Sequence, residues 1–202
     1  HFGLGGGLIT TPAIHLILNQ PPFIAVGTPL IVNIPTALLG AYNYNKKGFL
    51  RKNLVLPLAA GGSAGAFLGA ALTKLFSGSF VLFLTAIAIF FVGLRFVFSP
   101  TPKTKIKKEL TFPALMFAGA LIGVFSGFLG LGGGFLLVPF LSLFLGLDMK
   151  TTFGTSLAVI LLITVPAATV HFFLGHINLK LGMLLSLGVL PGAYLGSTVA
   201  LR

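Results

Sequence analysis

The chain has 202 residues, of which 56% are hydrophobic and only 7% charged, with a mean hydropathy of +1.08. A water-soluble domain cannot bury so much apolar surface, so the composition excludes an ordinary soluble protein and indicates a membrane protein. The formal net charge of +11 comes from 13 Lys and Arg against 2 acidic residues. Because these basic residues stand in short loops between apolar runs, we interpret them as topology-setting charges and expect no nucleic-acid partner.

Hydrophobic stretches separated by short loops predict an all-α membrane protein, a helical bundle that crosses the bilayer several times. Several stretches have the ~20 residues that a helix needs to cross the hydrocarbon core. The first and the sixth are shorter, and each adjoins the sequence Gly-Leu-Gly-Gly-Gly. In chain order the stretches are Leu4–Leu18, Gly27–Tyr44, Asn53–Phe76, Phe80–Phe98, Phe112–Leu129, Phe135–Leu147, Phe153–Leu174 and Leu179–Leu201.

The glycine motif occurs twice, at Gly3–Gly7 and at Gly130–Gly134. Three consecutive glycines have low helix propensity and permit backbone angles that are closed to other residues. We therefore predict that each motif breaks a helix within the membrane, either as a re-entrant hairpin or as a tight pair of helices. In a bilayer such a break persists only where protein or a water-filled cavity covers it.

The two motifs belong to an internal repeat with an offset of 127 residues. Most matching positions are Gly, Pro and Thr, which decide where a chain bends and how closely helices approach. We predict a first repeat half over 1–98, a cytoplasmic linker over 99–111 and a second half over 112–202. Each half has an apolar stretch without a counterpart in the other, so we expect both ends of the chain to be truncated. The matches are Pro12 with Pro139, Gly27-Thr28 with Gly154-Thr155, Gly48 with Gly175, and Gly61, Gly65 and Gly69 with Gly188, Gly192 and Gly196.

The positions of the basic residues predict the orientation of the two halves. When the loop at 46–52 is placed in the cytoplasm, all of the 13 Lys and Arg except Lys74 and Lys180 lie on the cytoplasmic side. Such enrichment is the positive-inside rule. The repeat partner of that loop, at 173–179, then lies outside. The two halves are therefore expected to point in opposite directions, as in the inverted repeats of many secondary transporters.

The apolar stretches contain no acidic residue, because Glu109 and Asp148 both stand in loops. This pattern excludes carboxylate proton relays and carboxylate-held metals, and the absence of cysteine excludes thiolate metal sites. We expect no metal and no cofactor. What remains is backbone and uncharged side chains. A helix that begins in mid-membrane presents free N–H groups and the positive end of its dipole, which together suit a small anion.

Each glycine motif leads into such a helix, and two helix ends that converge on one cavity would bind an oxyanion, with hydroxyl groups orienting it. The alternative is that the glycines only permit close helix packing. For the rows at 61, 65, 69 and 188, 192, 196 we favour packing, because a spacing of four lines one helix face. The predicted substrate-binding residues are Gly5, Gly6, Gly7, Thr10, Thr28, Asn33, Gly132, Gly133, Gly134, Thr155 and Ser156.

Individual polar residues leave alternatives open. Thr28 and Thr155 are expected to begin the helix after each motif, where they either cap that helix or aim hydroxyl groups at an anion. Asn33 lies at a depth where polarity is costly, so we favour a site role over a helix–helix hydrogen bond. Histidine is the side chain that could couple protons near neutral pH, and His15 and His171 are the candidates. The alternative for a lone histidine near a helix end is an interfacial position.

The repeated pattern resembles the TauE/SafE family of membrane transporters, also described as sulfite exporters. The resemblance rests on the glycine motif followed by Pro12 or Pro139, on the downstream Gly-Thr pairs and on the glycine rows, and it covers both halves. It implies a bacterial or archaeal inner-membrane permease that moves sulfur-containing oxyanions such as sulfite, sulfonates or sulfoacetate. Pro29 stands where the second half has Ser156, which is a departure from symmetry at the expected site.

We therefore predict a multi-pass secondary transporter, an exporter of small sulfur-containing oxyanions that works by alternating access between its halves. The alternative is an anion channel on the same scaffold. An intramembrane enzyme is disfavoured, because the apolar stretches lack acids, cysteine and a histidine pair at metal-ligand spacing. The expected partners are a small anionic substrate and the lipid bilayer. The sequence leaves the oligomeric state, the direction of transport and the coupling ion undetermined.

Overall fold

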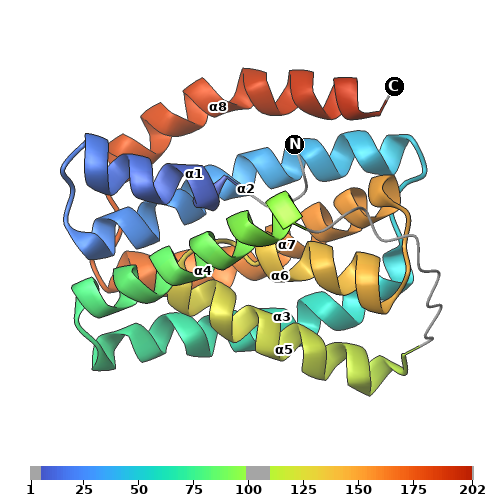
Figure 1. Ribbon diagram of the computed structural model, residues 1–202, viewed down its shortest axis with the longest axis horizontal. Helices are drawn as coiled ribbons and strands as arrows, with labels where there is room; N and C mark the ends of the chain where they lie inside the picture. Colours follow the sequence, from blue (N-terminus) through green and yellow to red (C-terminus); the bar gives the residue numbers. More distant parts are fainter. Residues whose placement is uncertain (1–5, 99–109, 202) are drawn as a thin grey trace.

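The computed structural model describes residues 6–98 and 110–201, with only the backbone described for 95–98. The described part consists of helices joined by short loops and contains no strand (Figure 1). The elements are α1 (Gly7–Pro12), η1 (Ala13–Ile17), α2 (Pro22–Lys46), α3 (Lys52–Leu72), η2 (Thr73–Leu75), α4 (Gly78–Phe98), α5 (Phe112–Leu129), α6 (Gly134–Pro139), η3 (Phe140–Phe144), α7 (Met149–Phe173) and α8 (Leu179–Ala200).

Five helical segments of the described part are long and apolar enough to cross a membrane, namely α2, α3 with η2, α5, α7 and α8. Three shorter apolar helices accompany them, at Gly7–Ile17, Gly78–Leu94 and Gly134–Phe144. Many large apolar side chains on the outside of the bundle are exposed, among them Phe83, Phe90 and Leu187. Apolar surface of this extent suits a lipid environment, and the predicted all-helical membrane fold is confirmed at this level.

The predicted helix starts need one correction. Gly27-Thr28 and Gly154-Thr155 do not begin helices, because α2 starts at Pro22 and α7 starts at Met149. Proline is favourable in the first turn of a helix, where its missing N–H is not needed. In α7 the carboxylate of Asp148 is the N-cap and accepts the Thr151 N–H at 3.0 Å. The two Gly-Thr pairs therefore lie inside helices and cannot cap them.

The offset of 127 residues reappears in the secondary structure. α1 and α6, η1 and η3, and α2 and α7 share bounds at this offset, and α8 begins at the counterpart of the first residue of α3. In each half a six-residue α-helix ends at Pro12 or Pro139 and continues as a five-residue π-helix. Proline lacks the N–H of a regular helix and its ring crowds the preceding turn, which explains why the helix widens at this point.

The bundle is packed most closely where α3 meets α5. Gly61, Gly65 and Gly69 of α3 lie directly against backbone carbonyl groups of α5, so that a Cβ atom at any of them would collide with main chain. This confirms packing as the role of the first glycine row. The second row behaves differently, because Gly188 and Gly192 in α8 have no neighbour within 4 Å of a Cβ position. For these two positions the packing interpretation is wrong within the described chain.

Neighbouring long helices run in opposite directions across the bundle. In Figure 1, α2 runs from left to right and α7 runs back from right to left, and the same reversal relates α3 to α8. α2 and α7 occupy the middle of the view, α3 and α5 lie below them, and α8 forms the upper edge. Gly6 and Gly7 of the first motif lie at the start of α1, and the second motif lies between α5 and α6, next to the central helices.

Candidate functional site

The second glycine motif interrupts the helix as predicted. α5 ends at Leu129, and the Gly130 N–H closes its last turn on the Ser126 carbonyl at 3.0 Å. Gly130, Gly132 and Gly133 have φ angles of +67°, +77° and +76°. This left-handed conformation is costly for residues with a Cβ atom, which explains the choice of glycine. The chain then starts again as α6 at Gly134.

Gly7 of the first motif lies against the second motif. Gly7 is buried at the start of α1, and a Cβ atom there would lie 3.0 Å from the Leu131 carbonyl oxygen of the second motif. Gly5 falls outside the described residues. Two segments separated by more than half of the chain therefore meet, as the repeat suggested.

Asn33 of α2 contacts both motifs. Its Oδ1 accepts the Gly6 N–H at 2.7 Å, and its Nδ2 lies 2.5 Å from the position that a Cβ atom at Gly132 would take. Asn33 is fully buried, yet its Nδ2 has no hydrogen-bond partner among the described residues. An unpaired buried donor costs about 1–3 kcal/mol, so a ligand with acceptor atoms would be favoured there.

A second unpaired polar atom lies close to the same motif. Ser126 is buried in the last turn of α5, and its Oγ lies 3.2 Å from the Cβ position of Gly133. This Oγ has no hydrogen-bond partner in the described chain. The first amides of α6, at Gly134 and Phe135, also have no acceptor within the helix. Within the described residues the junction thus gathers hydrogen-bond donors and contains neither a basic side chain nor a carboxylate. Sequence reasoning missed Ser126, although a lone serine one turn before a helix break is a detectable signal.

Thr10 and Ser156 make local hydrogen bonds near this junction. The Thr10 hydroxyl donates to the Gly6 carbonyl at 3.0 Å, and so supports the first turn of α1. Ser156 is buried in α7 and donates to the Phe153 carbonyl at 3.1 Å. It stands one turn before Ile160, whose side chain lies 3.8 Å from the Cβ position of Gly132.

Thr28 and Thr155 bind loops instead of the glycine junction. The buried Thr28 hydroxyl accepts the backbone N–H of Asn178, just before α8, at 3.1 Å. The buried Thr155 hydroxyl accepts the backbone N–H of Arg51, just before α3, at 3.2 Å. Each threonine thus ties its helix to a loop of the other half, and the two contacts lie at opposite ends of the bundle (Figure 1).

The two histidine candidates pair with groups other than Asn33. The Nδ1 atom of His15 pairs with the Gln20 carbonyl at 2.9 Å, in the turn between η1 and α2. His171 is fully buried near the end of α7, and its Nδ1 lies 3.1 Å from Nδ1 of His176. The sequence analysis did not single out His176 and did not foresee this pair. A spacing of five residues across a helix end does not by itself show that two rings meet.

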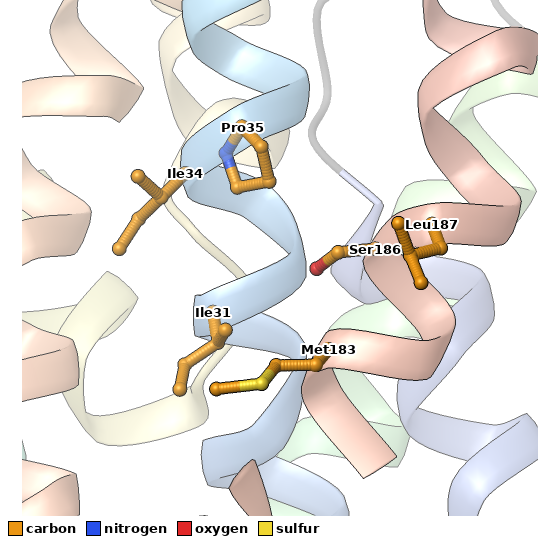
Figure 2. A pocket seen from close by; sticks show the side chains of 6 residues that line it. All are labelled: Ile31, Ile34, Pro35, Met183, Ser186 and Leu187. Carbon is orange, nitrogen blue, oxygen red and sulfur yellow. The ribbon is translucent and has the colours of Figure 1, made fainter. Parts of the chain in front are cut away.

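A groove of about 460 Å³ between α2 and α8 is of a different kind (Figure 2). Five of its six lining residues are apolar, and the hydroxyl of the sixth, Ser186, donates to the Gly182 carbonyl at 2.7 Å. The groove therefore lacks the free donors that an anion needs. Its lining is Ile31, Ile34, Pro35, Met183, Ser186 and Leu187.

Comparison with known proteins places the chain in a family. Residues 1–202 match the family described as "Sulfite exporter TauE/SafE". The chain belongs to the TauE/SafE family. The predicted resemblance is therefore confirmed.

Individual relatives carry similar names. The chain is 29% identical to "Probable membrane transporter protein YunE" of Bacillus subtilis, with 96% of this chain and 79% of that protein aligned. It is 26% identical to "Probable membrane transporter protein YdhB" of the same species, over 96% and 82% of the two chains. "Probable membrane transporter protein ORF9" of Sinorhizobium is 29% identical, over 98% and 76%. No solved structure matches the chain. With its five apolar helices, this TauE/SafE member is a multi-pass membrane transporter.

Proposed function

We propose that this TauE/SafE protein is a secondary transporter that exports small sulfur-containing oxyanions, such as sulfite or organosulfonates, by alternating access. The observation that carries the proposal is Asn33, which contacts Gly6 of the first motif and lies beside Gly132 of the second. Its buried Nδ2 donor is unpaired within the part of the chain that the structure describes. The family description names sulfite export, which agrees with a site built from hydrogen-bond donors.

The chemistry of the junction favours an oxyanion over a cation or a neutral solute. Asn33 Nδ2, the Ser126 hydroxyl and the first amides of α6 are donors, and the start of α6 adds the positive end of a helix dipole. Glu109 and Asp148, the two acids, stand outside the apolar stretches, and Asp148 is engaged as a helix cap. A small anion would therefore be stabilised without any basic side chain.

Reciprocal contacts support an inverted repeat and, with it, alternating access. Thr28 binds the backbone of Asn178, and their repeat partners Thr155 and Arg51 make the same hydrogen bond. Gly27 likewise lies against the His176 carbonyl, and Gly154 lies against that of Phe49. When a contact from the first half to the second recurs from the second half to the first, at equivalent residues, the two halves are related by a two-fold axis. We infer two oppositely oriented halves that rock against each other around Asn33.

The distribution of charge supports an orientation in the cell membrane. At the right-hand end of the bundle in Figure 1 the described chain carries five basic side chains, and at the left-hand end it carries two, Lys74 and Lys180. The positive-inside rule assigns the more basic end to the cytoplasm, and with it the loop between α2 and α3. The basic side chains at that end are Lys46, Lys47, Arg51, Lys52 and Lys150.

Flux measurements in proteoliposomes test the transport proposal. Purified protein should move labelled sulfite or a sulfonate such as sulfoacetate with saturation, and it should distinguish these anions from sulfate and taurine. Flux that stays proportional to concentration, without dependence on a counter-ion, would instead support the channel alternative. Equal response to all of these solutes, or to none, would contradict an oxyanion site.

Variants of the junction test the site. Asn33→Leu should weaken anion binding roughly 10- to 100-fold, because a hydrogen bond to a charged group contributes about 1.5–3 kcal/mol. Asn43→Leu is the matched control, since Asn43 lies on the same helix but donates to Ser197 in α8. Gly6→Leu and Gly133→Leu should abolish flux while membrane insertion persists. Full activity in both glycine variants, or equal affinity in the two asparagine variants, would refute the site.

A further inference from the structure

The loop between α7 and α8 holds a chain of hydrogen bonds made by two imidazoles. His171 Nε2 lies 2.8 Å from the Gly127 carbonyl, and His171 Nδ1 lies 3.1 Å from His176 Nδ1. A carbonyl only accepts, so His171 Nε2 carries the hydrogen. In neutral His171 the Nδ1 atom is then an acceptor, and His176 Nδ1–H donates to it. The Nε2 atom of His176 remains open to a further proton.

The two-fold relation shows that this loop can form without histidine. The equivalents of His171 and His176 are Tyr44 and Phe49 in the loop after α2. The same backbone hydrogen bond closes both loops, at 2.9 Å from His176 to His171 and at 3.0 Å from Phe49 to Tyr44. The ring of His176 stacks on Phe23, and the ring of Phe49 lies beneath Lys150, the equivalent of Phe23. Both loops therefore have the same backbone structure, and only the loop between α7 and α8 carries a histidine pair.

We propose that His171 and His176 form the proton-binding site of this transporter, and that the pair takes up a proton when its end of the bundle opens. The coupling of this proton to anion movement rests on the proposed transport function. A proton that binds to His176 Nε2 allows His176 Nδ1 to pass its own proton to His171 Nδ1. One N–H bond forms at His176 Nε2, one breaks at His176 Nδ1 and one forms at His171 Nδ1. His171 Nε2–H keeps its hydrogen bond to the Gly127 carbonyl, one turn before the break at Gly130. No other bond is made or broken.

The surroundings of the pair disfavour a charge in the described conformation. Phe23 and Gly27 of α2 and the Gly127 carbonyl of α5 lie against it, and none of these groups ionises. The titratable side chains at this end of the described chain are His15, Lys74 and Lys180, and both lysines are exposed. Burial, and to a smaller extent the neighbouring His171, lowers the pKa of His176 to about 4.

The direction of coupling follows from linkage. A water-exposed imidazole has a pKa of about 6.5, so opening of this end raises the affinity of His176 for protons. Between about pH 6.5 and about pH 4 the open form binds more protons than the closed form. Acid on this side of the membrane therefore favours the open form, and release of the proton favours closure.

The test replaces the pair with its counterparts from the other end, in the double variant His171→Tyr, His176→Phe. The first measurement is thermal stability in detergent. The wild type should lose stability as pH falls from 7.5 to 5.0, because the unfolded chain binds a proton that the buried pair does not. The double variant should lose clearly less. His176→Asn, which keeps a donor near the Nδ1 position but does not titrate, serves if the double variant does not fold.

The second measurement is anion flux in proteoliposomes under an imposed pH gradient. The gradient should drive flux in the wild type, and the variants should keep downhill flux but lose this response. The proposal is overturned if both the stability and the flux of the variants respond to pH as in the wild type. It is also overturned if His15→Gln abolishes these responses instead. Loss of the pH-dependent stability with an unchanged gradient response would overturn the coupling. If the wild type moves no anion, the transport function fails, while the stability measurement still decides whether the pair binds a proton.

Discussion

The glycine rows of α3 and α8 are equivalent in sequence and different in surroundings. Gly61, Gly65 and Gly69 let α3 approach α5 until main chain touches main chain, whereas Gly188 and Gly192 have no neighbour within 4 Å in the described chain. A row of small residues therefore permits close approach but does not supply the partner. In membranes, where lipid solvates apolar side chains as well as protein does, this backbone contact is a main source of helix association. Matched positions in the two halves can separate the effect of a residue from that of its neighbours.

The largest contrast is expected at one matched pair of glycines. Gly65→Leu should cost about 3 kcal/mol or more of stability, because its side chain would enter the backbone of Ala120 in α5. Gly192→Leu should change stability by less than about 0.5 kcal/mol, since nothing lies within 4 Å of that position. Thermal unfolding of both variants in the same detergent measures the contrast. Similar losses in the two variants would show that α8 also has a close packing partner.

A smaller contrast is expected between two glycines in the left-handed region. Gly175→Ala should cost about 1–2 kcal/mol for its φ of +72° alone, because no atom lies nearby. Gly132→Ala should cost about 1 kcal/mol more, since its methyl group would also press on Asn33. It should in addition weaken anion binding, which Gly175→Ala should leave unchanged. Equal anion affinity in the two variants would argue against a site beside Asn33.

The two threonines test the two-fold relation directly. Thr28→Val and Thr155→Val each remove the acceptor for a backbone N–H in the opposite half, and each should cost about 1 kcal/mol. Both variants should keep their anion affinity, because these hydroxyls bind loops. The measurement is thermal stability together with ligand binding. Lost affinity in one variant alone would give that threonine a role in the site and break the symmetry.

The weakest contrast concerns two helix caps. Asp148 and Asn178 cap α7 and α8 by accepting the Thr151 and Leu181 amides, so each change to Ala should cost about 1 kcal/mol. Burial acts to raise the pKa of Asp148, but hydrogen bonds from Thr151 and the charge of Arg51 outweigh it, and the net pKa is lowered. The Asp148 contribution is therefore present above about pH 4 and lost as pH falls through the lowered pKa. Stability measured from pH 7 to pH 3 should show this loss for Asp148 and a pH-independent effect for Asn178.

Much of the architecture could be predicted from local sequence. Long apolar runs identified the helices, and Pro12 and Pro139 marked equivalent positions where each short helix widens. The predicted helix starts are less accurate: the Gly-Thr pairs lie inside α2 and α7, whereas Pro22 and Asp148 carry the stronger start signals. The prediction that the second motif breaks a helix is confirmed by the left-handed glycines.

The candidate site was foreseen only in part. Among the predicted residues, the structure brings Asn33 together with Gly6 and Gly132. Ser126 was missed, and Thr28 and Thr155 hold loops. Residue types and spacing do not tell which way a side chain points once helices pack. The roles of these residues in binding remain predictions that the variants above can test.

The sequence by itself determined that this protein lies in a membrane, the order of its helices and its internal repeat. These properties follow from apolar content, from glycine and proline, and from a fixed offset, all of which act along the chain. Only the tertiary structure decided that Asn33 lies beside Gly6 and Gly132 and that two histidines share a hydrogen bond. It also decided that the glycine row of α3 packs against a neighbouring helix, whereas Gly188 and Gly192 of α8 do not. Those contacts join segments far apart in sequence, and packing of the whole bundle selects them because no local preference can.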